Sequence, residues 1–314
     1  MARVSRFSAV LAVAMCGLGA AAAFAEEPSS VEVSIEAQAA EGFPSSLALA
    51  ELPQWGHDYG EAMRAAKAAG RMLLIYFYDP SETTVRNAFI NNSLADERIT
   101  TKLAEYELLA LPTTAEVPLN GRSVRLLGHG AFAEMLGRQG IAIVDQRGGE
   151  NPYFGYVVSV YPFYPGRYMG ADRLSVMLNL PEGTLTQRTL VFAVRIHPEA
   201  PASTEGECCR VLEEYARRSS QHMADITLQG HHNWESRFHE INAQLPGGLT
   251  SQEVCAESWP GESLVDAAIE CVDSWRHSPG HWSAVRSRSD RFGYDMKRGR
   301  NGIWYATGIF GRRR

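Results

Sequence analysis

The segment Cys271–Trp282 constrains the fold of this 314-residue chain more than any other, with the sequence Cys-Val-Asp-Ser-Trp-Arg-His-Ser-Pro-Gly-His-Trp. The residues before it predict a helix over 263–275, with apolar side chains repeating at steps of three and four. The Ser-Pro-Gly that follows predicts a turn, because proline and glycine interrupt helices. His281 and Trp282 come directly after this turn. We therefore expect a fixed imidazole beside an indole, facing a pocket.

Two upstream stretches are expected to converge on the same pocket. A helix is predicted over 208–228, and Gly230 ends it just before His231. An irregular stretch then leads to Leu249, and Glu257 follows in Ala-Glu-Ser. Two imidazoles and a carboxylate suit Zn²⁺ with an open coordination position. The ligand hypothesis is therefore His231, Glu257 and His281, with Trp282 at the wall, and without a metal the trio is a hydrogen-bonded cluster.

The order of these motifs resembles the bacterial branch of the CAP superfamily, which comprises the cysteine-rich secretory, antigen 5 and pathogenesis-related proteins. The resemblance covers 208–311 and includes Met-Ala before His231, Ala-Glu at Glu257, the string Trp275–His281, and two strands that end in Phe-Gly. It implies an α-β-α sandwich around an antiparallel sheet. It also implies a cavity of two histidines and two acidic residues, to which His231, Glu257 and His281 correspond. The fourth position is Ser278 here, so one acidic member is missing.

The preceding part of the chain alternates between helical and strand patterns, which is typical of an α/β domain. Strands are predicted over 72–78, 108–111, 141–144 and 156–161, and helices over 58–69, 83–90, 94–106, 132–137 and 172–180. The pattern over 185–196 fits either a helix or a strand. The fold class predicted for the whole chain is therefore α/β followed by α+β.

This first part resembles the thioredoxin-like superfamily over roughly residues 52–197. The matching features are Trp55, Tyr59, Ala62, Gly70-Arg71 and the strands 73–78 and 141–145. In that family the redox cysteines follow the first of these strands, but the corresponding stretch, Tyr78–Thr84, has no cysteine. Thiol–disulfide exchange requires a thiolate. The resemblance therefore predicts a degenerate domain without oxidoreductase activity, which acts as a scaffold or docks a partner.

The N-terminus has the pattern of a secretory signal peptide. Arg3 and Arg6 precede an apolar, alanine-rich stretch, and Ala23-Phe24-Ala25 fits a cleavage site. Cys16 offers a lipoprotein alternative, which Met15 before it disfavours. We expect a signal peptide over 1–25, a flexible leader over 26–50, a thioredoxin-like domain over 51–197, a linker over 198–207 and a CAP-like domain over 208–314. No later stretch reaches the ~20 apolar residues of a membrane span. The signal-peptide pattern predicts export to the periplasm or the extracellular space.

Cysteine number and charge add two expectations. Four cysteines remain after the signal peptide, Cys208, Cys209, Cys255 and Cys271, and an even number in an exported chain favours disulfides. Adjacent cysteines rarely pair with each other, so both pairings of Cys208 and Cys209 with Cys255 and Cys271 stay open. The net charge of −6 argues against a nucleic-acid partner.

These features favour an exported two-domain binding protein whose CAP-like module holds a ligand or a divalent metal such as Zn²⁺. Its partner would be a ligand or an envelope protein. Two alternatives stay open: a metal-dependent hydrolase that acts on peptide or cell-wall material, with Glu257 as base, and a structural protein of the envelope. The sequence favours binding over catalysis, because the ligand set is incomplete at Ser278 and no Gly-x-Ser-x-Gly or His-Glu-x-x-His motif occurs.

Overall fold

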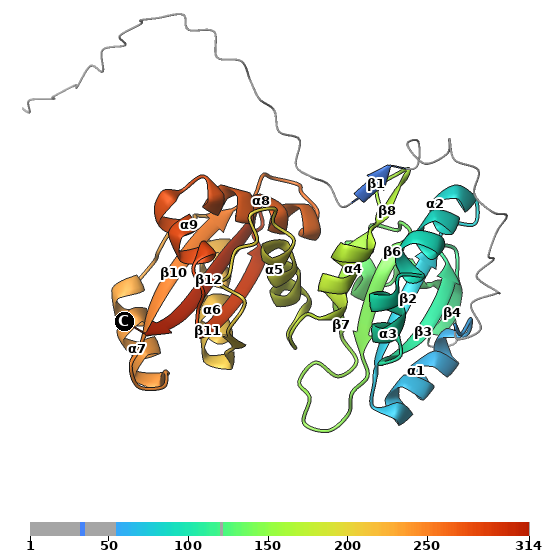
Figure 1. The fold of residues 1–314 in the computed structure, drawn as a ribbon, viewed down its shortest axis with the longest axis horizontal. Helices are drawn as coiled ribbons and strands as arrows, with labels where there is room; N and C mark the ends of the chain where they lie inside the picture. Colours follow the sequence, from blue (N-terminus) through green and yellow to red (C-terminus); the bar gives the residue numbers. More distant parts are fainter. Residues whose placement is uncertain (1–31, 35–54, 120–121, 314) are drawn as a thin grey trace, which may run out of the picture. The chain divides into compact units, whose positions relative to one another are not determined.

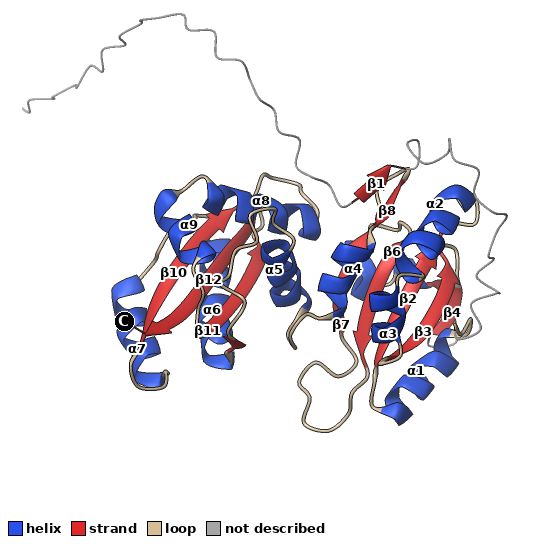
Figure 2. Ribbon diagram, viewed as in Figure 1, coloured by secondary structure: helices blue, strands red, loops and turns tan. Residues whose placement is uncertain are grey.

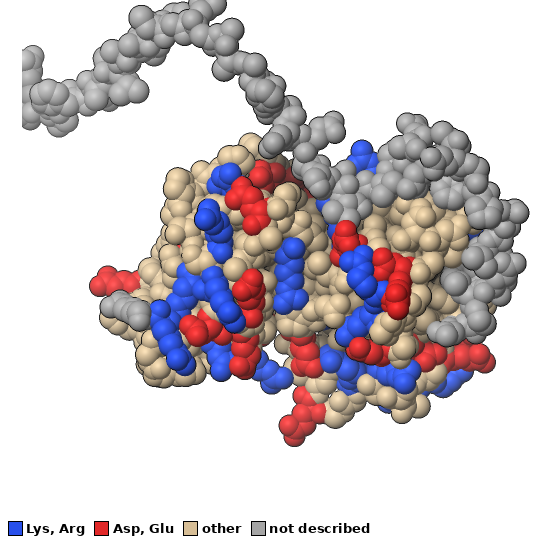
Figure 3. Space-filling view, viewed as in Figure 1, with Lys and Arg blue, Asp and Glu red and all other residues tan. Residues whose placement is uncertain are grey.

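The computed structural model describes residues 32–34, 55–119 and 122–313, all of which belong to one unit spanning 31–314. It contains two main sheets with helices beside them, so the α/β or α+β class is confirmed (Figures 1 and 2). The predicted signal peptide, including Cys16, lies outside the described residues. The predicted flexible leader over 26–50 does so too, except for residues 32–34, which form a short strand instead. Among the described residues no helix is both long enough and apolar enough to cross a bilayer. Acidic and basic side chains are interspersed over the face drawn in Figure 3.

The first sheet has four strands in the order β3-β2-β6-β7. They are β2 (Met72–Tyr78), β3 (Tyr106–Pro112), β6 (Gly140–Asp145) and β7 (Val157–Pro162). β3 pairs with β2 in parallel, whereas β6 and β7 continue the sheet in antiparallel pairing. The continuous apolar run of β2 suits this central place, because its alternate side chains are buried on both faces. Leu73, Ile75 and Phe77 enter one core, and Leu74 and Tyr76 the other.

The two faces of this sheet are covered unequally. One face packs against α2 (Thr83–Ala88), the π-helix η3 (Phe89–Leu94), α3 (Glu97–Leu103) and α4 (Ala171–Leu178). The other packs against α1 (Tyr59–Ala69) and the 3₁₀ segments η4 (Leu126–Gly128) and η5 (Gly130–Met135). Two short ladders lie outside the sheet: β4 (Glu116–Leu119) with β5 (Arg122–Arg125), and β1 (Glu32–Ser34) with β8 (Arg167–Met169).

The second sheet has the order β10-β12-β11-β9. β10 (Leu249–Glu257), β12 (Trp304–Arg313) and β11 (Arg291–Arg298) are antiparallel, and the short β9 (Glu207–Cys208) joins β11 in parallel. α6 (Arg210–Ile226) and α7 (Trp234–Gln244) pack on one face. α5 (Leu185–Arg195), α8 (Leu264–Arg276) and α9 (Pro279–Arg286) pack on the other. The sheet therefore lies between two helical layers (Figure 2).

Close backbone packing fixes α6 on this sheet. A Cβ at Gly293 of β11 would lie 2.3 Å from the backbone nitrogen of Glu213 and 2.4 Å from the carbonyl carbon of Leu212. Real Cβ atoms do not approach so closely, so only glycine fits there. Ser220 adds to the contact by donating a hydrogen bond to the Asp295 carbonyl, at 2.8 Å.

Helix α5 contributes to both cores. Thr184 caps it through a capping box with Gln187, which explains why the ambiguous segment is helical. Phe192 belongs to the core of the first sheet, whereas Leu190, Val191 and Val194 belong to the core of the second. The segment predicted to be a linker, 198–207, is packed as well. The amides of Ala202 and Ser203 donate to the carbonyls of Arg286 and Val285, both at 3.1 Å.

Most predicted helices and strands are confirmed within a few residues, but three segments differ from their predictions. The stretch predicted to be irregular contains α7, in which Ile241 is the one buried residue. The predicted turn after Trp275 is the start of α9, because Pro279 occupies a first-turn position where its missing N–H costs nothing. The helix predicted over 132–137 is the 3₁₀ segment η5, which ends at Leu136 in the left-handed region.

The predicted disulfides do not form among the described residues, where all four cysteines are free thiols. The sheet separates the two buried thiols. Cys255 packs with Met223 and Tyr305 on the α6 side, whereas Cys271 belongs to the core beneath α8 and α9. The predicted partner Cys208 lies in β9, at the opposite edge of the sheet from Cys255 in β10, and donates its S–H to Glu213 at 3.2 Å. A disulfide requires Cβ atoms about 4 Å apart, which Cys208 and Cys255 cannot reach across two intervening strands.

Candidate functional site

His231 lies in the loop between α6 and α7, and this loop is tied to its surroundings at two points. The side chain of Gln229 donates a hydrogen bond to the Cys255 carbonyl of β10, at 3.2 Å. The guanidinium of Arg237 on α7 donates twice to the His232 carbonyl, at 2.9 and 3.1 Å. His231 is therefore held over β10 by contacts on both sides of it in the sequence.

His281 reaches the site from the first turn of α9. Its Nε2 lies 3.1 Å from Nε2 of His231, so the two predicted histidines do meet. The next residue, Trp282, is buried, contacts the tilted ring of His197 at a centroid distance of 4.8 Å and donates from Nε1 to Glu199 at 3.0 Å. Neighbouring residues on a helix point in directions about 100° apart. Trp282 therefore anchors α9 in the core while His281 faces His231, and it is not a wall of the histidine site.

The carboxylate that contacts His231 is Glu253, not the predicted Glu257. His231 Nδ1 lies 3.0 Å from Glu253 Oε1, and Arg237 binds both oxygens of Glu253. Glu257 is exposed at the end of β10, and among the described residues no hydrogen bond joins it to either histidine. Residues 253 and 257 share a face of the strand but are roughly 13 Å apart along it, at ~3.3 Å per residue.

The electrostatics fix the hydrogen-bond direction. Burial alone would raise the pKa of the Glu253 carboxyl, but hydrogen bonds from His231 and Arg237, together with the Arg237 charge, outweigh it and hold this pKa below its usual range. An ionised carboxylate only accepts hydrogen bonds. His231 therefore donates from Nδ1, which leaves Nε2 with its lone pair when the ring is neutral, directed at His281.

The protonated form of His281 is disfavoured. Burial lowers the pKa of this imidazole and the neighbouring His231 lowers it further, against an opposing effect of Glu253. In the neutral pair, His281 Nε2–H donates to His231 Nε2. The opposite tautomer of His281 would instead direct two Nε2 lone pairs at one point.

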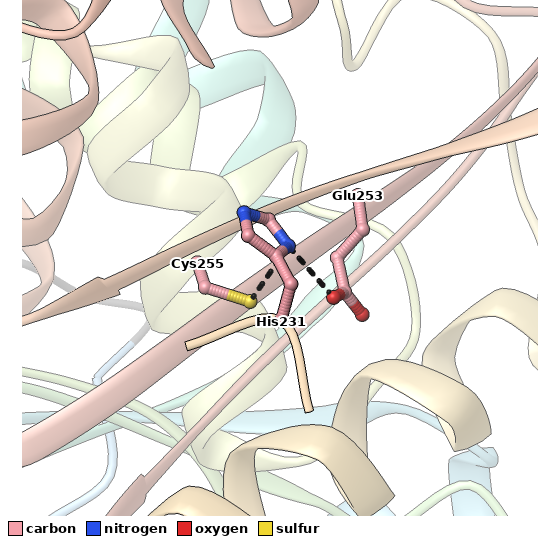
Figure 4. A group of neighbouring side chains, drawn as sticks. All are labelled: His231, Glu253 and Cys255. Carbon is pink, nitrogen blue, oxygen red and sulfur yellow. Dashed lines mark hydrogen bonds and ion pairs between the residues drawn. The ribbon is translucent and has the colours of Figure 1, made fainter. Parts of the chain in front are cut away.

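Cys255 lies on the inner side of His231, and Figure 4 shows it with Glu253 on the same strand. Its Sγ is 3.7 Å from His231 Nδ1, and possible ligand atoms of these three residues lie within 4.8 Å of one another. Burial raises the pKa of Cys255 well above its ordinary value, and the Glu253 charge adds to this effect. Since a metal-bound cysteine is a thiolate and Arg237 already occupies Glu253, this inner trio is poorly suited to a metal.

The two Nε2 atoms fit a metal better. Two nitrogens bound to one tetrahedral Zn²⁺ at ~2.0–2.1 Å lie about 3.3 Å apart, close to the 3.1 Å found here. A metal-ligating histidine usually donates its other N–H to a carboxylate, which fixes ring and tautomer. Glu253 has that position beside His231. The donor set thus fits a divalent metal with two protein ligands and open positions for water or a ligand.

The sequence predicted both histidines but missed Glu253 and Arg237. The available signal was the alternation in β10, which puts Glu253, Cys255 and Glu257 on one face. Choosing among them requires the position of His231 along the strand, which depends on the loop after α6.

No family model matches this chain, and no curated protein does. Among solved structures it is similar to an outer surface protein from Borrelia burgdorferi, with 20% identity over 35% of this chain and 78% of that chain. The TM-score is 0.28, so we infer neither fold nor function from this similarity.

Proposed function

We propose that this is an exported binding protein whose C-terminal module holds a divalent metal of the Zn²⁺ type between Nε2 of His231 and Nε2 of His281. The observation that carries the proposal is the 3.1 Å separation of these atoms, with His231 oriented by Glu253. Glu253 and Arg237 would set the ring orientation. The remaining coordination positions would be open to a ligand.

We further propose that the first domain is a degenerate thioredoxin-like fold and the second a CAP-type sandwich. The first assignment is supported by β2 and β6, the two strands of the sequence match, which are direct neighbours. The second is supported by the helical layers on both faces of an antiparallel sheet. Export rests on the signal-peptide pattern of residues 1–25.

Binding is better supported than hydrolysis. A general base must reach the proton that it removes, but Arg237 occupies both oxygens of Glu253. Glu257, the base of the hydrolase alternative, has no hydrogen bond to either histidine among the described residues. The geometry of the described residues therefore supports metal holding over hydrolysis, because no free carboxylate among them lies beside the two histidines.

Calorimetric titration of the protein with Zn²⁺ near neutral pH tests the proposal. We expect one ion per chain, and a loss of affinity of about 100-fold in His231→Ala and in His281→Ala, since each removes one of two ligands. Glu253→Gln should weaken binding about 10- to 100-fold, the range typical for an outer-shell partner. Circular dichroism checks that each variant is folded.

His277→Ala is the matched control, because His277 is exposed and lies four residues before His281. It should bind Zn²⁺ like the wild type. Affinity should fall as the pH decreases, because protons compete for both Nε2 atoms. Because the pKa of His281 is lowered, protons compete with Zn²⁺ at this residue only at a lower pH than at an ordinary histidine. No Zn²⁺ binding by the wild type, or unchanged binding by His281→Ala, contradicts the proposal.

A further inference from the structure

A cavity lies in the first domain, far along the chain from the histidine pair. Its volume is about 690 Å³, within the ~300–1,000 Å³ typical of small-molecule sites. It is lined from the start of α1, the end of β3, the β4–β5 hairpin and the η4–η5 segment. This is the face of the first sheet that, among the described elements, has one α-helix and short 3₁₀ segments to cover it.

The floor of the cavity is apolar and already packed. Leu111, Leu126, Phe132 and Val144 line it and are also buried members of the core between the sheet and α1. Side chains fixed in a core have few alternative rotamers. The cavity is therefore largely preformed and offers apolar contact to an occupant.

Opposite charges stand on two walls of the same cavity. Arg64 belongs to α1. Its Nη1 and the Oδ1 of Asp58 would each lie 3.3 Å from a Cβ built on Gly60, which places the guanidinium beside the first turn of the helix and near its capping carboxylate. Glu116 belongs to β4 and accepts a hydrogen bond from Ser123 at 2.6 Å. Among the described residues, neither Arg64 nor Glu116 forms an ion pair. Each charge is therefore available to an occupant.

These charges restrict the chemistry of the occupant. Besides two imidazoles, the lining has one guanidinium and two carboxylates, those of Glu116 and of Asp58, which caps α1. A simple anion would meet an excess of negative charge, and a simple cation would leave Arg64 unpaired. A molecule with one charge of each sign and an apolar middle matches both walls and the floor.

We propose that this cavity binds a short apolar peptide with free termini, a site independent of the metal site. The peptide carboxylate binds Arg64, whose planar donors suit carboxylates. The peptide ammonium faces Glu116, and the apolar side chains cover the floor.

Titration of the full chain with trileucine tests this site, by calorimetry or by amide chemical shifts. We expect saturable binding to the wild type, weakened tenfold or more in Arg64→Gln and in Glu116→Gln, because each loses a charge-assisted contact. Ala131→Phe, which puts a ring into the cavity lining, should abolish binding. Arg71→Gln and Glu97→Gln change exposed charges outside the cavity and should leave it unchanged.

Modified peptides assign the two ends. C-terminal amidation of trileucine should lower its affinity for the wild type as much as Arg64→Gln lowers the affinity for unmodified trileucine. The amidated peptide should bind Arg64→Gln no more weakly than unmodified trileucine does. N-acetylated trileucine should show the same relation to Glu116→Gln. Absence of trileucine binding to the wild type overturns the proposal, and so does binding that neither charge removal nor Ala131→Phe weakens.

Discussion

The ion pair between Arg237 and Glu253 combines a structural and a positioning role. Glu253 is fully buried as a side chain and Arg237 is 14% exposed. Removing one partner of a buried pair leaves an uncompensated charge. We expect Arg237→Met to lower the free energy of unfolding by about 3 kcal/mol or more, measured by urea denaturation at neutral pH.

Arg218→Met is the matched comparison, since Arg218 pairs with Glu214 at the surface and is 60% exposed. Exposed pairs contribute ~0–1 kcal/mol. Arg218→Met should therefore lower the free energy of unfolding by no more than about 1 kcal/mol. Equal effects of the two substitutions would mean that Glu253 is not effectively buried.

At the level of single residues, the sequence predicted which residue types form the site better than it predicted which of them contact each other. His231 and His281 could be predicted because each comes five residues after the end of a long helix, α6 or α8. Glu253 could not be chosen over Glu257, because a strand offers the same face every second residue. The loop that sets the position of His231 depends on side-chain contacts from Gln229 and Arg237, which have no local signature.

The packing of α6 on β11 depends on the missing side chain at Gly293. In Gly293→Ala the new Cβ would meet the backbone of α6 within 2.4 Å at two atoms. A backbone cannot move aside as a flexible side chain can, so helix and strand must separate. We expect a loss of about 3 kcal/mol, or failure to fold, measured by thermal and urea unfolding.

Gly130→Ala is the control for this substitution. Its Cβ would have nothing within 4 Å, so the stability should change by less than about 1 kcal/mol. A mild effect of Gly293→Ala, similar to that of Gly130→Ala, would contradict the close approach of α6 to β11.

Elements with a strong local signal were predictable from sequence, and the others were not. β2 has an unbroken apolar run, and Ser263 and Thr184 cap α8 and α5. α7 lacks an apolar stripe because it buries only Ile241, so its periodicity is weak. α9 begins with a proline, a residue that sequence rules treat as a breaker even though the first turn tolerates it.

At the scale of the whole molecule, the two sheets share packing elements. α5 places Phe192 in one core and Leu190 in the other, and Val265 of α8 also joins the first core. Thr186 of α5 also donates to the buried Asp295 of β11, at 2.6 Å. Loss of either core would therefore expose apolar surface of the other.

We expect both sheets to unfold in one cooperative transition, with equal calorimetric and van't Hoff enthalpies. Differential scanning calorimetry measures both. Two separated transitions would show that the sheets are stabilised independently and that the shared helix contributes little.

The placement of Cys255 and Cys271 on opposite faces of one sheet has a consequence for the reactivity of these thiols. Each lies in a hydrophobic core, Cys255 with Met223 and Tyr305 and Cys271 with Trp275. Burial also raises the pKa of both thiols, which keeps them as poor nucleophiles. Both thiols should therefore react slowly with thiol reagents as long as the native packing is intact.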